Sequence, residues 1–349
     1  MNSTAKRGVI SPYQLFFIFL VSRAVVALTF YQSILKDGIS PDTLLSSALA
    51  LIINLLLCFP ALLCCTKNKN PINSKIGKLF YLGYFLFFEA VNISRFAFFA
   101  ADKTTKGSSA LFFIVIMAAA AAYASHLGIE AIGRFCAPCA MISVFVLLII
   151  ILLNSESFHY INFMPFFVGT RSEIIENALI FSSNSIEPAL LLVLFDKCST
   201  NQKKSLLFGI AASYVAIFLM MLFCIGVLGS AASLFSYPVY TLFQMTAFGS
   251  FSRLDIVYTA FGFFALFAKC AVVFYCAEQT LFKVPRKTRA PLLFIASCVL
   301  SLVIYQRFYD EMMNSARSFY LFISLAFLLI VPLLSLIFMK KEEANEKRI

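Results

Sequence analysis

The chain has 349 residues, of which 61% are hydrophobic and 13% are charged, and its formal net charge is +11. Soluble domains carry about 25% charged residues, so this chain lacks the polar side chains that a water-exposed surface needs. The composition excludes a soluble enzyme, a disordered protein and a secreted disulfide scaffold. Long apolar runs between clusters of charged residues predict an integral membrane protein made of helices.

Ten apolar segments are long enough to cross the hydrocarbon core of a bilayer. In chain order, the predicted spans cover about residues 12–34, 43–66, 79–101, 107–125, 135–154, 177–195, 205–229, 256–277, 290–306 and 318–339. The segment 234–248 has no charge but is short and contains Pro238, so we expect a re-entrant or interfacial element there. Residues 340–349 form a charged tail.

Lys and Arg are distributed unevenly between the two sets of connections. Of the 28, 18 fall in connections on one side, 7 fall on the other side, and the rest lie inside spans. Because basic residues concentrate in cytoplasmic loops, we expect both termini to be cytoplasmic. The basic excess is therefore interpreted as a topology signal, and no nucleic-acid partner is expected.

Ten spans in one polytopic domain, 1–349, divide into halves of five, at about 9–154 and 173–339. An odd number of spans per half predicts an inverted-topology repeat. The first span is interrupted by Ser22-Arg23, and its counterpart, the sixth, by the polar run 182–185, followed by Glu187-Pro188. Four consecutive polar residues sweep most of a helix circumference. We therefore expect both helices to lose regular winding near the membrane centre, as in discontinuous transporter helices.

Other polar residues lie inside the third and eighth spans, which are again counterparts. Glu89 and Asn92 lie in the third span and Lys269 in the eighth. A charge at the bilayer centre costs about 2.5–3.5 kcal/mol, so these groups are expected to meet one another, water or a ligand. Two interpretations stay open: buried structural pairs, or a polar pocket between the first, third, sixth and eighth spans.

On the second interpretation, the candidate ligand-binding residues are Ser22, Arg23, Glu89, Asn92, Phe181, Ser182, Ser183, Asn184, Ser185, Glu187 and Lys269.

Three sequence patterns resemble those of the spore-germination nutrient-receptor B-subunit family, within the amino acid–polyamine–organocation transporter superfamily. The most specific runs through Tyr237-Pro238-Val239-Tyr240, Phe251-Ser252-Arg253-Leu254-Asp255 and Phe267-Ala268-Lys269. The opening 10–16, ISPYQLF, is also typical of these subunits. The run 181–187, FSSNSIE, is similar to the sixth-helix pattern of the superfamily.

The resemblance implies a LeuT-type fold with discontinuous first and sixth helices. It also implies a place in the inner membrane of a dormant spore, beside a larger A subunit and a C-subunit lipoprotein, and an amino acid as the usual germinant. This sequence departs from the superfamily pattern at two points. The glycine-rich break of the first helix is replaced by Ser22-Arg23-Ala24, and the sixth-helix glycine is Ser185.

Three functions remain possible at this stage. The first is a germinant sensor that binds a small nutrient in the mid-membrane pocket. The second is an amino-acid permease coupled to H⁺ or Na⁺, with Glu89 or Glu187 carrying a proton or Lys269 occupying a cation site. The third is a structural subunit without ligand. The sequence contains no Walker loop, HExxH motif or nucleophile elbow, so we expect neither an enzyme nor a cofactor.

Overall fold

The computed structural model describes residues 9–30, 39–103, 109–167, 169–198, 200–235, 237–246, 254–282, 284–308 and 317–339. In this part of the chain the regular structure is helical. The first half contains α1 (Pro12–Phe30), α2 (Pro41–Thr66), the short η2 (Pro71–Asn73), α3 (Lys75–Lys103), α4 (Ala110–Leu127) and α5 (Ile129–Leu153). Residues 31–34 of the predicted first span and the predicted tail 340–349 lie outside the described residues.

The second half is more fragmented. It contains η3 (Tyr160–Phe163), α6 (Arg171–Ser183), α7 (Glu187–Leu194), η4 (Phe195–Lys197), α8 (Gln202–Leu228), η5 (Gly229–Leu234), α9 (Pro238–Met245), α10 (Leu254–Thr280), α11 (Arg286–Val303), η6 (Ile304–Phe308), α13 (Arg317–Leu325), η7 (Ala326–Ile330) and α14 (Val331–Phe338). The elements α13, η7 and α14 follow one another without a gap and form a single long segment.

Nine helical segments among the described residues are long and apolar enough to cross a membrane. The helix α1, with 19 residues, packs among them as a further long helix, in agreement with the prediction of about ten spans. The eight residues of α9 span only about 12 Å, so this element is too short to cross. The protein is therefore a multi-pass membrane protein.

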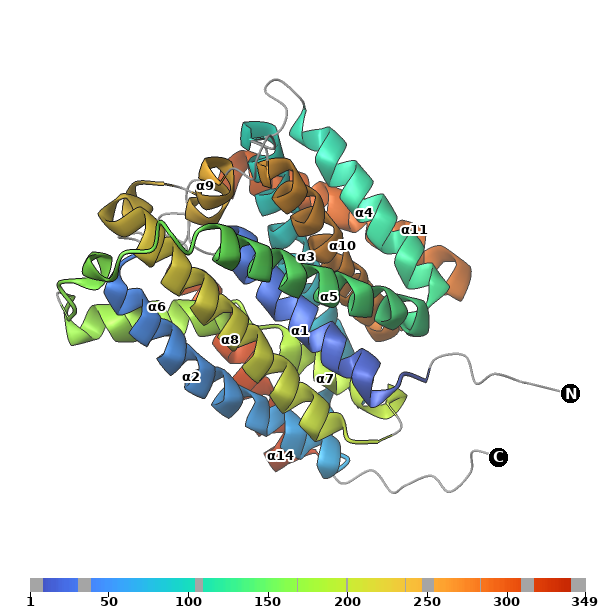
Figure 1. The fold of residues 1–349 in the computed structure, drawn as a ribbon. Helices are drawn as coiled ribbons and strands as arrows, with labels where there is room; N and C mark the ends of the chain where they lie inside the picture. Colours follow the sequence, from blue (N-terminus) through green and yellow to red (C-terminus); the bar gives the residue numbers. More distant parts are fainter. Residues whose placement is uncertain are drawn as a thin grey trace, which may run out of the picture.

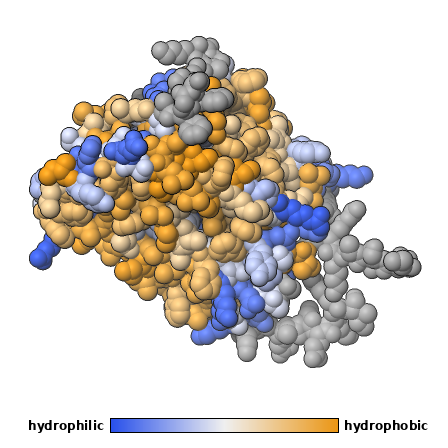
Figure 2. Space-filling model, viewed as in Figure 1, coloured by the Kyte–Doolittle hydropathy of each residue, from blue (hydrophilic) through white to orange (hydrophobic). Residues whose placement is uncertain are grey.

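The helices form one bundle in which α1, α3 and α10 contribute to the interior. The helix α1 packs against α5, α8 and α10, whereas α3 packs against α4, α10 and α11. Figure 1 shows α4 and α11 together on one side of the bundle and α2 with α14 on the opposite side. On the face drawn in Figure 2, hydrophobic residues cover the middle and hydrophilic residues gather towards the edges. This distribution is typical of a protein surface that is surrounded by a lipid bilayer.

The prediction of a discontinuous sixth helix is confirmed, because α6 ends at Ser183 and α7 begins at Glu187. The prediction that the first helix is interrupted at Ser22-Arg23 is wrong, because α1 is continuous from Pro12 to Phe30. Backbone unwinding is unnecessary there. Both polar side chains find hydrogen-bond partners in α7, α8 and the end of α6, so the helical backbone bonds can be kept.

Side-chain contacts fix the relative direction of α3 and α11. Glu89 of α3 contacts Ser297 of α11, and Ser94, further along α3, contacts Ser301, further along α11. Contacts that advance together along both helices mean that the two helices run parallel. The predicted topology, in which the third and ninth spans cross in the same direction, requires this arrangement.

The beginning of α1 is fastened to the connection between α7 and α8. The amide of Ile10 donates a hydrogen bond to the carbonyl of Lys197 at 2.8 Å, within an isolated parallel bridge between Ile10 and Cys198. The Ser205 hydroxyl donates to the carbonyl of Pro12 at 2.9 Å. These contacts tie the first helix of one half to the broken helix of the other.

Candidate functional site

The break between α6 and α7 leaves backbone groups without their helical partners. The amide of Ser185 donates to the carbonyl of Ser182 at 3.1 Å instead of to the carbonyl of Phe181 four residues back. The last carbonyl groups of any helix need partners from elsewhere. A guanidinium nitrogen of Arg23, on the continuous α1, donates to the carbonyl of Phe181. The broken helix and the buried arginine therefore satisfy each other.

The carboxylate of Glu187, in the first turn of α7, holds the other side of the break. Its Oε1 accepts a hydrogen bond from Ser22 Oγ of α1 at 3.0 Å, and its Oε2 accepts one from Ser185 Oγ at 2.6 Å. A negative charge in the first turn of a helix is favoured by the helix dipole. Glu187 is thus a fully buried carboxylate that joins α1 and the non-helical Ser185 to the start of α7.

Two residues outside the predicted set extend this network. Tyr214 of α8 accepts hydrogen bonds from Arg23 Nη2 at 2.6 Å and from Asn54 Nδ2 of α2 at 3.1 Å. Asn54 Oδ1 lies 2.9 Å from Ser185 Oγ, so the single hydroxyl proton of Ser185 can go to Asn54 or to Glu187. Sequence reasoning missed both residues, although a lone Asn in the apolar run LIINLLL was an available signal.

The ammonium group of Lys269, on α10, supplies a second positive charge. Its Nζ lies 4.9 Å from the ring centroid of Phe88, a distance at which a cation–π interaction is favourable. The charged residues in its surroundings include Glu187, of opposite sign, and Arg23, of the same sign. Two basic side chains therefore accompany one acidic side chain in this cluster.

The remaining predicted residues lie in two different places. Ser182 Oγ donates to the carbonyl groups of Ala178 and Ala50, and Ser183 Oγ donates to the carbonyl of Ile180. Asn184 is the buried C-cap of α6. These three residues shape the end of the helix.

Glu89 and Asn92 do not join the cluster. Glu89 Oε2 accepts from Ser297 Oγ of α11 at 3.3 Å, and Asn92 Nδ2 donates to the carbonyl of Phe88 in its own helix. The structure therefore brings together Ser22, Arg23, Phe181, Ser185, Glu187 and Lys269, and places the third-span residues apart. Of the two interpretations left open by the sequence, a pocket between the first, third, sixth and eighth spans does not include the carboxyl group of Glu89, which contacts α11.

The cluster is occluded. Arg23, Glu187 and Lys269 each expose at most 1% of their surface, and the groups that contact them belong to the surrounding helices and to the break. A small molecule can reach these groups only after helices move or side chains exchange their partners.

Two cavities open towards opposite ends of α10, with Lys269 between them along the helix. One, of about 480 Å³, is lined by Phe96, Lys103, Tyr240, Asp255 and Phe263, among others. The other, of about 1000 Å³, surrounds the α4–α5 turn. Its lining includes the charged residues Glu130, Arg134, Lys197, Glu278 and Arg289, and also His126.

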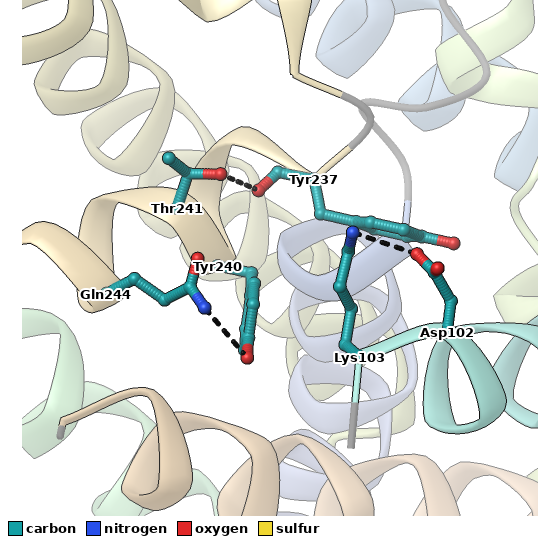
Figure 3. Close-up of polar contacts among 6 residues, drawn as sticks. All are labelled: Asp102, Lys103, Tyr237, Tyr240, Thr241 and Gln244. Atoms are coloured by element: carbon teal, nitrogen blue, oxygen red, sulfur yellow. Dashed lines mark hydrogen bonds and ion pairs between the residues drawn. The ribbon is translucent and has the colours of Figure 1, made fainter. Parts of the chain in front are cut away.

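The short helix α9 borders the smaller cavity. Tyr240 OH donates to Asp255 Oδ2 at 3.2 Å and accepts from Gln244 Nε2 at 3.2 Å. Figure 3 shows Tyr240 and Gln244 on α9, with Lys103 at the end of α3 beneath the ring of Tyr237. The Lys103 ammonium lies 5.6 Å from that ring centroid. Aromatic contacts thus attach α9 to the end of α3.

Comparison with solved structures places this architecture among known transporters. The chain is similar to Mhp1, a nucleobase-cation-symport-1 family transporter solved in a closed conformation with bromovinylhydantoin bound. The TM-score is 0.53 at 13% identity, over 95% of this chain and 80% of the other. The chain is therefore a helical membrane protein with a LeuT-type fold.

Comparison with protein families is more specific. The family described as "Spore germination protein" matches residues 9–314, and the chain belongs to that family. A search of curated proteins finds no match.

Proposed function

We propose that this chain is the ligand-sensing membrane subunit of a spore germinant receptor, and that the cluster around the α6–α7 break binds a small nutrient, such as an amino acid. Membership of the spore germination family supports the biological setting. The observation that carries the proposal is the buried grouping of Arg23, Glu187 and Lys269 at a broken helix. A broken helix in a membrane is tolerated where its freed backbone is buried in protein or lines a water-filled cavity.

An amino-acid zwitterion matches this grouping chemically. Its ammonium group would replace the hydroxyl donors Ser22 and Ser185 at the carboxylate of Glu187. Its carboxylate would be bound by Arg23 or Lys269, where charge-assisted hydrogen bonds are stronger than neutral ones. The two cavities at the ends of α10 would then be routes of approach, one from each side of the membrane.

Signalling follows if the ligand binds one conformation better than another, because the population shifts by the differential affinity. We place the subunit in the spore inner membrane, with both termini cytoplasmic, where an A subunit and a C-subunit lipoprotein would read the conformational change. Net transport is not needed for this role.

The proposal is tested by binding of radiolabelled amino acids to the purified full chain in lipid nanodiscs. We expect Glu187→Gln to weaken binding of the preferred amino acid at least tenfold, since a charge-assisted hydrogen bond to a buried group contributes about 1.5–3 kcal/mol. The matched control is Glu176→Gln, which changes an exposed glutamate of the neighbouring α6. Equal binding by wild type and Glu187→Gln would refute the assignment of the site.

The second candidate is an amino-acid permease coupled to H⁺ or Na⁺, which the transporter fold favours. Uptake of the same labelled amino acid into proteoliposomes separates the two roles. Gradient-driven accumulation by this chain alone would support the permease and remove the sensor-only interpretation. Binding without accumulation would support the sensor.

A further inference from the structure

Glu89 forms a buried polar site apart from the ligand cluster. It is fully buried on α3, and its Oε2 accepts one hydrogen bond, from Ser297 Oγ of α11 at 3.3 Å. Among the residues that the structure describes, its Oε1 has no hydrogen-bond partner and neither oxygen has an ion-pair partner. This environment differs from that of Glu187, whose two oxygens both accept hydrogen bonds.

The charged and titratable groups around Glu89 do not neutralise it. The thiols of Cys270 on α10 and Cys298 on α11 are its electrostatic neighbours. Lys269 lies over the adjacent Phe88 and interacts with Glu187 and Arg23. Arg95, six residues further along α3, points about 120° away from Glu89 around the helix. An ionised carboxylate buried without a cation costs several kcal/mol, and such a group takes up a proton instead.

The interface between α3 and α11 continues as a row of hydroxyl groups. Ser301 follows Ser297 by one turn on the same face of α11, is fully buried, and its Oγ has no partner among the described residues. Ser94 Oγ of α3 donates to the carbonyl of Ser301 at 2.8 Å. Hydroxyl groups can both donate and accept, so a hydroxyl such as that of Ser297 can bond to Glu89 in either protonation state.

We propose that Glu89 is a proton-binding site, held as a neutral carboxylic acid in the occluded conformation. On release, the O–H bond of the acid breaks, its electron pair stays on Glu89, and the proton passes to a water molecule that reaches the site when the helices move. The resulting negative charge would lie beside Phe88, on whose ring Lys269 rests. Glu89 would then compete with Glu187 for the same ammonium group, so proton release and the ligand cluster would be linked through Lys269.

Infrared spectroscopy of the full chain in nanodiscs at neutral pH tests the protonation directly and needs no ligand. A protonated carboxylic acid gives a C=O stretching band above the amide I band, which shifts in ²H₂O. We expect this band in wild type and in the control Glu176→Gln, and its loss in Glu89→Gln. A wild-type spectrum without the band, or an unchanged band in Glu89→Gln, would overturn the proposal.

Two further measurements keep the test decisive if Glu89→Gln does not fold. Ser297→Ala removes the hydrogen bond to Oε2 of Glu89, so the band should move to higher frequency without losing intensity. A band at the same frequency counts against Glu89.

The second measurement is thermal unfolding at constant ionic strength. Replacing choline by Na⁺ should leave the melting temperature of wild type unchanged. Stabilisation by Na⁺ that is absent in Ser297→Ala would mean that a metal cation occupies the site, which also overturns the proposal.

The link to the ligand cluster rests on the proposed function and has its own readout. The affinity for the bound amino acid should depend on pH in wild type, and this dependence should be reduced in Glu89→Gln. A pH profile identical in both proteins would refute the coupling, whereas absence of amino-acid binding in wild type would refute the proposed function and leave the infrared result valid.

Discussion

At the scale of single residues, Tyr214 is the acceptor on which two other side chains depend. Its hydroxyl oxygen accepts from Arg23 and from Asn54, both buried. Leaving a buried donor without a partner costs about 1–3 kcal/mol. We therefore expect Tyr214→Phe to lower the free energy of unfolding by about that amount, seen as a lower melting temperature of the purified protein.

The matched control is Tyr123→Phe, because Tyr123 lies exposed on α4. Tyr123→Phe should have the same melting temperature as wild type. Equal melting temperatures for all three proteins would show that the bonds to Tyr214 contribute nothing to stability.

The same residues show what the sequence allows one to predict. The run of four polar residues before Glu187-Pro188 is visible without structure, because no helix face can hide it, and the break lies there. Ser22-Arg23 has only two polar residues, and their partners Glu187 and Tyr214 lie more than 160 residues away in sequence. Whether such a pair unwinds a helix depends on tertiary contacts, so the continuity of α1 could not be predicted.

Glu89 illustrates the same limit. Its burial inside the membrane follows from the sequence, but its direction towards α11 depends on how α3 is rotated in the bundle. Asn54 and Tyr214 were missed because a single polar residue in an apolar span has no partner that sequence alone identifies.

At the scale of elements, the beginning of α3 depends on a close approach at Gly77. A Cβ atom there would overlap the carbonyl group of Pro71 in η2 and the hydroxyl of Ser74. Since the obstacle is backbone, we expect Gly77→Ala to cost about 1–3 kcal/mol, as overpacking does. Thermal unfolding of the purified variant measures this loss.

Gly83 in the same helix provides the control, because a Cβ atom there meets nothing within 4 Å. Alanine favours a helix over glycine by up to about 1 kcal/mol, so Gly83→Ala should be neutral or slightly stabilising. Destabilisation by both substitutions to the same extent would contradict the close contact between α3 and η2.

At the scale of the whole molecule, the proposed orientation can be tested by labelling from either side of the membrane. All ten native cysteines are free thiols, and all but Cys298 are buried, so background labelling should be low. Exposed residues are available on both sides: His126 at the end of α4, and Tyr160 in the connection between α5 and α6. The predicted topology places His126 in the cytoplasm and Tyr160 outside.

We expect an impermeant maleimide added to sealed right-side-out vesicles to label Tyr160→Cys and not His126→Cys, and the reverse in inverted vesicles. Wild-type vesicles measure the background. Labelling of His126→Cys from outside would reverse the orientation, and labelling of both positions from the same side would contradict the odd number of crossings between them.

The backbone contact between Ile10 and Lys197 limits how the halves can rearrange. Because Lys197 belongs to η4, which directly follows α7, this hydrogen bond connects the start of α1 to α7, and we expect the two helices to move together. Residues 184–186, directly before Glu187, are not helical, so the backbone can bend there between α6 and α7. We therefore expect a change in the hydrogen-bond partners of Glu187 to alter the angle between α6 and α7.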